Sequence, residues 1–293
     1  MTSFRGINKV VKAQEFQMGN IRVKQALPGG GLNDIDPFLL LHHAGPFQIK
    51  PGSNHKKLGV GPHPHRGFEP VSFVFKGSLQ HRDSVGNNDV LNDGDIQWMT
   101  SGKGIIHSER PPKKVTDYGG TQEFIQLWVN LPGKHKLTEP SYQNIRKMDF
   151  PLLKPDKGNG EIQLISGKLN RKSGPAKTFT PILALKAHFK KGAQSIIAIE
   201  SSHNALVYVV NGTLKINGLT EVAKEHMVHF NNDGESIEIE AIEDAGFLVL
   251  SGEPIREPVS TYGPFVMNTN DEIMSAIRDY QQGKMGELVE NFD

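Results

Sequence analysis

The sequence predicts an all-β protein of two related domains, with one short helix near residue 275. Thirty-one glycines and eighteen prolines are spread through the 293 residues, and they separate short runs of Val, Ile, Leu and Phe. This pattern is typical of many short strands joined by turns, as in a β-sandwich or barrel, rather than of strands that alternate with long helices. At roughly 150 residues per domain, the length corresponds to two domains.

Two segments at similar places in the two halves predict β-hairpins. The segment "VSFVFKGSLQHRD" at 71–83 places strand-like runs on either side of Gly77, and "ALVYVVNGTLKI" at 205–216 does the same around Asn211 and Gly212. Asn-Gly is the dipeptide best suited to the positive φ angles of a type I′ turn. The two glycines are 135 residues apart, so the halves resemble each other at this point.

A second matched pair of segments indicates an internal duplication. "NDGDIQWM" begins at Asn92 and "NDGESIEI" begins at Asn232, 140 residues later. Offsets this long indicate two related domains rather than a solenoid of short repeats, although β proteins also reuse similar turns by chance. The polar, proline-rich stretch at 130–143 is the expected boundary, which gives domains over 1–135 and 136–293.

The last part of the chain predicts a helix. Thr269 and Glu272 have the spacing of a capping box, and Ile273, Ala276 and Ile277 then recur at helical intervals. We therefore expect a structural helix near 270–282 that packs one face on the body of the protein.

The composition excludes several classes of protein. Thirty-three Lys and Arg are balanced by 32 Asp and Glu, so no global basic field would attract nucleic acid or an anionic membrane. The absence of cysteine excludes disulfides, thiolate metal sites and cysteine nucleophiles. No signal-peptide core is present, and no apolar run approaches the roughly 20 residues that span a bilayer. A cytoplasmic protein without direct nucleic-acid or membrane binding is therefore expected.

Two motifs suggest a metal site. "PHPHRGFE" at 62–69 contains His63 and His65, and "GKGIIHSE" at 102–109 contains His107 and Glu109. In a strand, residues i and i+2 project to the same side, and Pro64 favours an extended conformation at His63. Two such pairs that converge across a small barrel would present three imidazole nitrogens and one carboxylate oxygen. Either motif alone is a weak signal, since the chain has twelve histidines.

This set of ligands limits the choice of metal. Three nitrogens and one oxygen without sulfur suit a borderline divalent ion: iron(II), manganese, nickel, cobalt or copper, with zinc as a further alternative. Four protein ligands on an octahedral ion leave two positions for water, substrate or oxygen. Such a site favours oxygen chemistry over the closed tetrahedral site of a structural zinc ion.

Neighbouring residues of these motifs are expected to serve the structure. His81 is expected on the surface of the first hairpin. Trp98 and Phe73 would either wall an apolar pocket or belong to the core, and we favour the core.

Several long motifs resemble those of the pirin family, within the cupin superfamily. They are "HPHRGFEPVSF", "DGDIQWMTSGKGIIHSE", "EFIQLWVNLP" and "GEPIREPVSTYGPFVMNT", in the order of the family, and together with the earlier "DIDPFLLLHHAGP" they cover most of the chain. The resemblance implies a bicupin: two tandem cupin barrels, of the double-stranded β-helix or jelly-roll type, with a mononuclear iron site in the amino-terminal barrel alone. The ligand positions of the family fall on His63, His65, His107 and Glu109. The resemblance therefore implies that Glu69, four residues after His65, supports the site or the fold and is not a ligand.

The resemblance also implies a function. It points to a quercetin 2,3-dioxygenase-type oxidoreductase, in which a planar, flavonol-like aromatic substrate binds at the metal and O2 opens its heterocycle with release of carbon monoxide. Glu109 would be the catalytic residue that accepts the proton of the flavonol hydroxyl. The alternative is an iron-dependent, redox-sensing regulator that binds a protein partner, as a transcriptional coregulator or a modulator of a metabolic enzyme, without catalysis.

The duplication predicts that the second domain lacks the ligands. With an offset of 135, His63 and His65 correspond to Ala198 and Glu200. With an offset of 140, His107 and Glu109 correspond to residues 247 and 249, which are Phe and Val.

Overall fold

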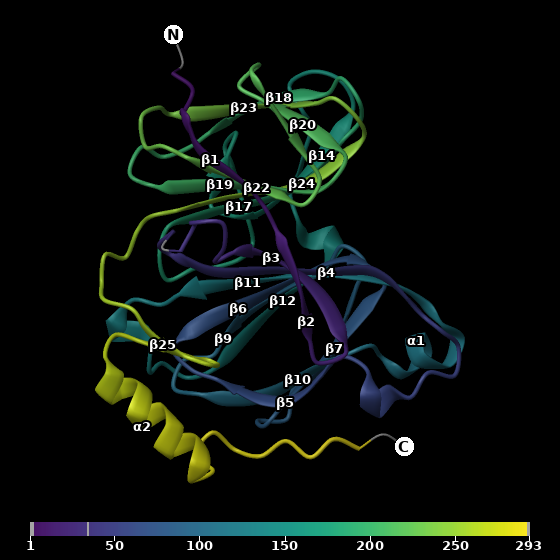
Figure 1. The fold of residues 1–293 in the computed structure, drawn as a ribbon, viewed down its shortest axis with the longest axis vertical. Coiled ribbons are helices and arrows are strands. Elements are labelled where there is room, and N and C mark those ends of the chain that lie inside the picture. Colours follow the sequence, from purple (N-terminus) through teal and green to yellow (C-terminus); the bar gives the residue numbers. More distant parts are fainter. Residues whose placement is uncertain (1–2, 34, 292–293) are drawn as a thin grey trace. The chain divides into compact units, whose positions relative to one another are not determined.

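The computed structural model describes residues 3–33 and 35–291, and most of these residues form strands (Figure 1). The all-β prediction is confirmed. The chain forms two compact units, which we call barrel A and barrel B. Barrel A comprises Glu15–Gln25, Phe38–Lys147 and Ile255–Asp293, and barrel B comprises Met1–Gln14, Ala26–Pro37 and Met148–Pro254.

Barrel A contains a seven-stranded and a four-stranded antiparallel sheet. The larger sheet has the strand order β12-β9-β6-β11-β4-β3-β2, and the smaller has the order β5-β10-β7-β8. The strands are β2 (Gln14–Met18), β3 (Ile21–Leu27), β4 (Phe38–Ile49), β5 (Val60–His65), β6 (Phe68–Lys76), β7 (Ser78–Asp83), β8 (Asn88–Asn92), β9 (Ile96–Thr100), β10 (Ile105–Arg110), β11 (Gly120–Asn130) and β12 (Ser141–Ile145). The short helix α1 (Lys113–Tyr118) joins β10 to β11.

Barrel B repeats this arrangement. Its larger sheet has the order β1-β22-β19-β24-β17-β14-β13, and its smaller sheet has the order β18-β23-β20-β21. The strands are β1 (Ile7–Lys12), β13 (Leu152–Leu153), β14 (Gly160–Ser166), β17 (Ile182–Phe189), β18 (Gln194–Ala198), β19 (Asn204–Asn211), β20 (Thr213–Ile216), β21 (Thr220–Ala223), β22 (His226–Phe230), β23 (Ser236–Ala241) and β24 (Ala245–Gly252). A small ribbon of β15 (Lys168–Leu169) and β16 (Lys172–Ser173) is attached to it.

The two sheet orders support the predicted duplication strand for strand. β9, β6, β11 and β4 of barrel A have the same neighbours as β22, β19, β24 and β17 of barrel B. The outer strand beside β9 is β12, whereas the outer strand beside β22 is β1, from the start of the chain. The compact units therefore differ from a division at 135/136, because β1 pairs with β22 in barrel B and the segment after residue 254 belongs to barrel A.

The two predicted hairpins are corners between sheets instead. β6 and β19 lie in the seven-stranded sheets, whereas the strands that follow them, β7 and β20, lie in the four-stranded sheets. Gly77 and Gly212 make the corners with φ of +78° and +76°, whereas Asn211 does not have a positive φ, so the turn is not of type I′. An added Cβ at either glycine would overlap a carbonyl oxygen, that of Thr121 or Asp244. The local turn signal was correct, but it does not show which sheet receives the next strand.

The interiors of the two barrels differ. Barrel B is filled by one apolar cluster, which includes Leu185, Val207, Ile239, Phe247 and Val249. One of the apolar clusters of barrel A consists of Ile21, Val23, Ala44, Val74, Leu79, Leu91 and Phe124. Barrel A also buries histidine and glutamate side chains, which cost free energy unless they are paired or bind an ion.

The predicted helix is α2 (Asn270–Gln281), and it has the expected capping box. Glu272 N donates to Thr269 Oγ1, and Glu272 Oε2 accepts from Thr269 N. Its apolar face packs against β26 (Phe265–Met267), which pairs with β25 (Ser260–Tyr262), within barrel A.

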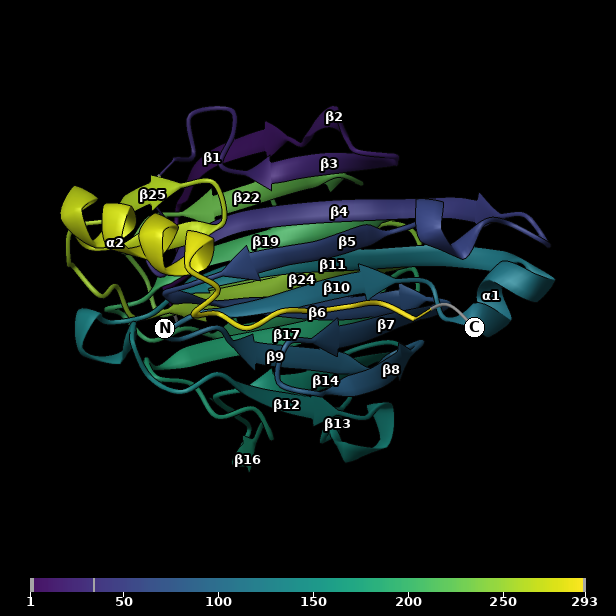
Figure 2. The same cartoon turned by 90° about the horizontal axis from the view of Figure 1, so that it is seen from below.

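The extended segment after α2 runs along the smaller sheet (Figures 1 and 2), where Glu290 accepts hydrogen bonds from Arg110 of β10. No helix of the described residues is long and apolar enough to cross a bilayer.

Candidate metal centre

Three histidines of adjacent strands converge inside barrel A. His63 and His65 lie on β5, and His107 lies directly opposite His63 on β10. The Nε2 atom of His63 is 3.0 Å from Nε2 of His65 and 3.0 Å from Nε2 of His107. His65 and His107 are buried, whereas His63 is partly exposed. The cluster is thus largely buried, and His63 is its partly exposed member.

The surrounding backbone fixes how these rings present their nitrogens. His63 Nδ1 lies 2.8 Å from the carbonyl oxygen of Gly61, so a hydrogen on Nδ1 leaves a lone pair on Nε2. The turn at Arg66 and Gly67 ends β5, and Gly67 has φ of +88°. A Cβ there would overlap the carbonyl oxygen of Val266, so this turn requires glycine.

The buried rings are neutral. Burial lowers the pKa of His65 and of His107 well below the usual value of 6.5, and the charge of a protonated His63 would lower both further. Neutral imidazole is the form of histidine that binds metal ions.

The donor set fits a metal ion. Metal–imidazole bonds of about 2.1 Å place neighbouring nitrogen ligands about 3 Å apart, as the Nε2 atoms are here. Two neutral rings can share one hydrogen, but three nitrogens that converge cannot all be satisfied in this way. His107 Nδ1 is also buried without a hydrogen-bond partner among the described residues. Within residues 3–33 and 35–291, no other group of three or more His, Cys, Asp or Glu side chains has ligand atoms this close together.

The fourth expected ligand, Glu109, lies beside the cluster and not in it. Its strand has a register shift between His107 and Glu109, and its carboxylate is not among the ligand atoms that lie within 4.8 Å of one another. The Gln126 side-chain amide donates to both carboxylate oxygens, at 2.8 and 2.9 Å, and Ser72 Oγ donates to Oε1 at 3.3 Å. Glu109 is therefore held between the two sheets with its orientation fixed.

Four further residues of the site were not found from the sequence. His81 was expected on the surface, but it is buried and its Nε2 is 3.2 Å from Glu109 Oε1. Gln126 and Ser72 bind the same carboxylate, and the Trp128 ring lies edge-on to His65 at a centroid distance of 5.3 Å. A signal was present for Gln126, which is a polar residue within the apolar strand "FIQLWV".

Glu69, Trp98 and Phe73 are all buried within barrel A. Glu69 Oε1 accepts a hydrogen bond of 2.9 Å from Thr100 Oγ1, and the carboxyl group is not part of the histidine cluster. Burial raises the pKa of Glu69 to about 7, and the hydrogen bond from Thr100 offsets only part of this rise.

Replacing Glu69 by glutamine is expected to remove part of the pH dependence of stability. Between the unfolded pKa of 4.5 and the folded pKa of about 7, the folded state binds more protons, so the free energy of unfolding falls as the pH rises through this range. The loss is about 3 kcal/mol and is complete above pH 7. Glu69→Gln should match wild type at pH 4.5 and exceed it in stability at pH 8.

The measurement is tryptophan fluorescence during urea unfolding of the metal-free protein. Both tryptophans, Trp98 and Trp128, belong to barrel A, so the signal reports the free energy of unfolding of the barrel that contains Glu69. Glu15→Gln, at an exposed position of the same barrel, is the control and should show no pH-dependent difference. A stability difference for Glu69→Gln that is equal at both pH values would contradict the raised pKa.

Barrel B has isoleucine at all four corresponding positions. β23 pairs with β18 and β20 as β10 pairs with β5 and β7. His107 pairs with His63 on the neighbouring strand of barrel A, and Ile237 pairs with Ile197 in the same way in barrel B. The two isoleucines therefore correspond to the two histidines. Glu109 pairs with the fourth residue of β7, which is His81, and Ile239 pairs with the fourth residue of β20. Ile239 therefore corresponds to Glu109. His65 then corresponds to position 199, which is also isoleucine.

The correspondences drawn from sequence offsets were therefore wrong, although barrel B does have other residues in place of the ligands. Residues 247 and 249 lie on β24, which corresponds to β11 and not to β10. The two "NDG" turns follow different strands, since Asn92 ends β8 and Asn232 follows β22. Residues 198 and 200 are one position out of register with the paired isoleucines.

Comparison with known proteins identifies the class and then the family. Two tandem barrels of this topology, one with a buried histidine cluster, define a bicupin with a candidate metal centre. Residues 20–129 match the family model Pirin, and residues 184–286 match the model for the pirin C-terminal cupin domain. The chain belongs to the pirin family.

Individual relatives agree with this membership. A Pseudomonas aeruginosa protein that bears the name "Putative quercetin 2,3-dioxygenase" is 41% identical over 252 residues. The match covers 85% of this chain and 86% of the relative's length. Human pirin is 34% identical over 98% of this chain and 96% of its own. The crystal structure of quercetin 2,3-dioxygenase from Acinetobacter baumannii superposes with a TM-score of 0.93 at 34% identity, over 98% of this chain and all of the other.

Proposed function

We propose that this protein is a metal-dependent dioxygenase that opens the heterocycle of a flavonol such as quercetin with O2. The observation that carries the proposal is the convergence of three histidine Nε2 atoms next to an oriented, buried carboxylate inside barrel A. The names of relatives at 41% and 34% identity support the substrate class.

The proposed ligands are His63, His65 and His107, with Glu109 as the fourth. They would hold one divalent transition metal ion, with iron(II) as the first expectation and manganese, nickel, cobalt, copper or zinc as alternatives. When bound, such an ion supplies Lewis-acid and redox chemistry with open positions for the substrate oxygen and for O2.

The protein side chains would bind the flavonol and move its proton. An Oε atom of Glu109 would accept the proton of the flavonol hydroxyl, while the Gln126 amide keeps the carboxylate in place. Trp128 is partly exposed beside His65 and would offer an apolar surface to a planar aromatic molecule. The buried Phe68 ring packs against it at a centroid distance of 4.2 Å and would hold it in place.

The test is oxygen uptake and carbon monoxide release with quercetin, measured on protein loaded with each metal in turn. Glu109→Gln is expected to lower kcat about 100-fold or more, because the amide cannot accept the proton. Glu15→Gln makes the same charge change at an exposed position of barrel A and should leave kcat unchanged.

Protein that contains about one equivalent of metal but neither consumes O2 nor releases carbon monoxide with any of the ions would refute the dioxygenase. The same preparations, used to capture a protein partner with iron in each oxidation state, would test the redox-sensing regulator.

A further inference from the structure

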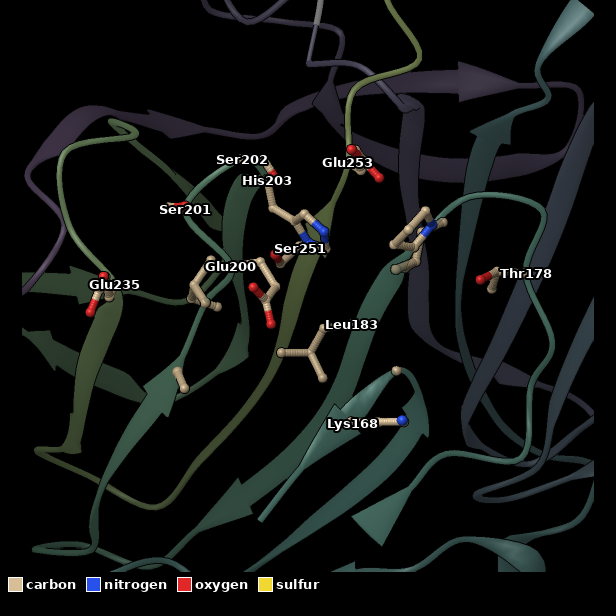
Figure 3. A pocket seen from close by; sticks show the side chains of 15 residues that line it. Lys168, Thr178, Leu183, Glu200, Ser201, Ser202, His203, Glu235, Ser251 and Glu253 are labelled. Carbon is tan, nitrogen blue, oxygen red and sulfur yellow. Dashed lines mark hydrogen bonds between the residues drawn. The ribbon is translucent and has the colours of Figure 1, made fainter. Parts of the chain in front are cut away.

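Barrel B contains a cavity of about 720 Å³ that has no place in the proposed dioxygenase function. It lies where β18 ends and the loop 199–203 leads to β19 (Figure 3). Leu183 of β17 and Ile199 form part of its apolar wall, and Glu200, His203 and Glu253 bring polar side chains to it. A volume of this size is within the range of sites for small organic ligands.

His203 is a buried polar group that faces this cavity without a full set of partners. Its residue is 6% exposed, and its Nδ1 is 3.0 Å from Ser251 Oγ. Figure 3 shows the ring extending into the cavity above Leu183. Nε2 has no hydrogen-bond partner among the described residues, and burial lowers the pKa of His203, which favours the neutral ring. With the hydrogen on Nδ1, Nε2 offers a lone pair to a ligand.

Two carboxylates near this ring have no cationic partner. The negative charges of Glu200 and Glu253 both act on His203, and neither carboxylate forms a salt bridge within residues 3–33 and 35–291. Glu235 adds a third carboxylate to the lining, whose one cationic side chain is Lys168, on a different wall in Figure 3. The positive charge of the buried Arg5 also acts on His203, so three carboxylates are set against two cations. The cavity thus has an excess of negative charge around a hydrogen-bond acceptor.

Hydrogen bonds from Arg5 hold the loop 199–203, which carries Glu200 and His203. Arg5 is fully buried, and its guanidinium donates to the carbonyl oxygens of Glu200, Ser201, His203 and Gly234 and to Asn232 Oδ1. A binding site whose backbone is already ordered loses less conformational entropy when a ligand binds.

We propose that this cavity binds a small organic cation, an amine, amidine or guanidine with a short apolar body. Its charged nitrogen would lie between the carboxylates of Glu200 and Glu253 and donate to His203 Nε2, while its apolar part would contact Leu183 and Ile199. Charge-assisted hydrogen bonds to carboxylates are the strongest that this lining offers. The site is separate from the histidine cluster and does not depend on the proposed dioxygenase activity.

The test is amide chemical-shift mapping by NMR with benzylamine, agmatine and putrescine as probes at pH 7, on metal-free and on metal-loaded protein. At least one of these cations is expected to shift amides of residues 198–203 and 251–253 with a saturable dependence on concentration. Benzyl alcohol and benzoate, which match benzylamine in size but are neutral and anionic, should not. Glu200→Gln and Glu253→Gln should each weaken binding about fivefold.

Glu221→Gln is the matched control, because it makes the same charge change at an exposed position of barrel B outside the cavity lining. Binding should be unaffected by this variant and by His63→Ala. The proposal fails if none of the three cations shifts these amides at 10 mM, an amount expected to saturate a site of roughly millimolar Kd. It also fails if benzyl alcohol binds as well as benzylamine, or if Glu221→Gln weakens binding as much as Glu200→Gln.

Discussion

Replacing His107 by alanine is expected to reduce the metal content of the purified protein from about one equivalent per chain to less than about a tenth. His107 is fully buried, and its Nε2 lies 3.0 Å from that of His63. Its loss therefore removes one of the three converging nitrogen ligands and leaves a void where the ring was. Oxygen uptake with quercetin should fall below detection, since a buried polar cavity without an ion has no redox chemistry to offer.

A measurement that does not depend on activity distinguishes loss of the metal from loss of the fold. Ligand binding at a free concentration of about a thousand times Kd stabilises a folded protein by about 4 kcal/mol. Added iron(II) or nickel(II) should therefore raise the midpoint of tryptophan-detected unfolding in wild type but not in His107→Ala. His188→Ala, an exposed histidine of barrel B, should behave as wild type. A full equivalent of tightly held metal in His107→Ala would refute the proposed ligand set.

The second large effect is expected from Arg5→Met, which should destabilise barrel B by about 3–5 kcal/mol. The guanidinium makes five hydrogen bonds, four of them to main-chain carbonyl oxygens, and methionine would leave these acceptors without a donor. Because Arg5 precedes β1, whereas its acceptors lie in 200–203 and 232–234, the same change should loosen the attachment of the first strand.

Hydrogen exchange followed strand by strand measures this loss where it occurs. Amides of β1, β18 and β23 should exchange faster in Arg5→Met, while those of β6 and β11 in barrel A should keep the wild-type rates. Lys224→Met removes an exposed cation from the same barrel and should change little. Equal exchange in Arg5→Met and Lys224→Met would show that the buried guanidinium does not stabilise the loop.

The sequence was informative where local rules decide the structure. Strand parity predicts that His63 and His65 share one face, because alternation of side chains along a strand holds whichever partner the strand has. It does not bring His107 to them, since that depends on the pairing of β10 with β5. A register shift also separates Glu109 from the histidines. The capping residues Thr269 and Glu272 marked the start of α2 for the same reason, since a cap depends on residues within one turn.

Long-range pairing is where the sequence was insufficient. Glycine suits both the corner at Gly77 and an ordinary hairpin turn. A hairpin would keep the next strand in the same sheet, whereas this corner leads from β6 in the larger sheet to β7 in the smaller one. His81 appeared to be a surface residue because its partner, Glu109, is brought to it only by the pairing of β7 with β10. The placement of β1 beside β22 depends on main-chain hydrogen bonds between residues more than 200 positions apart, which carry no local pattern.

The exchange of terminal segments between the two barrels has a consequence for how the protein is made on the ribosome. The turn after His65 is completed by residues 264–267, since Val266 N donates to the carbonyl oxygen of Arg66 and Gly67 fits against Val266. Barrel A therefore cannot be finished until residues 264–267 have emerged, and the first strand of barrel B must wait for residues 226–230. The turn that follows the histidine cluster can therefore reach its final form only after residues 264–267 have been synthesised.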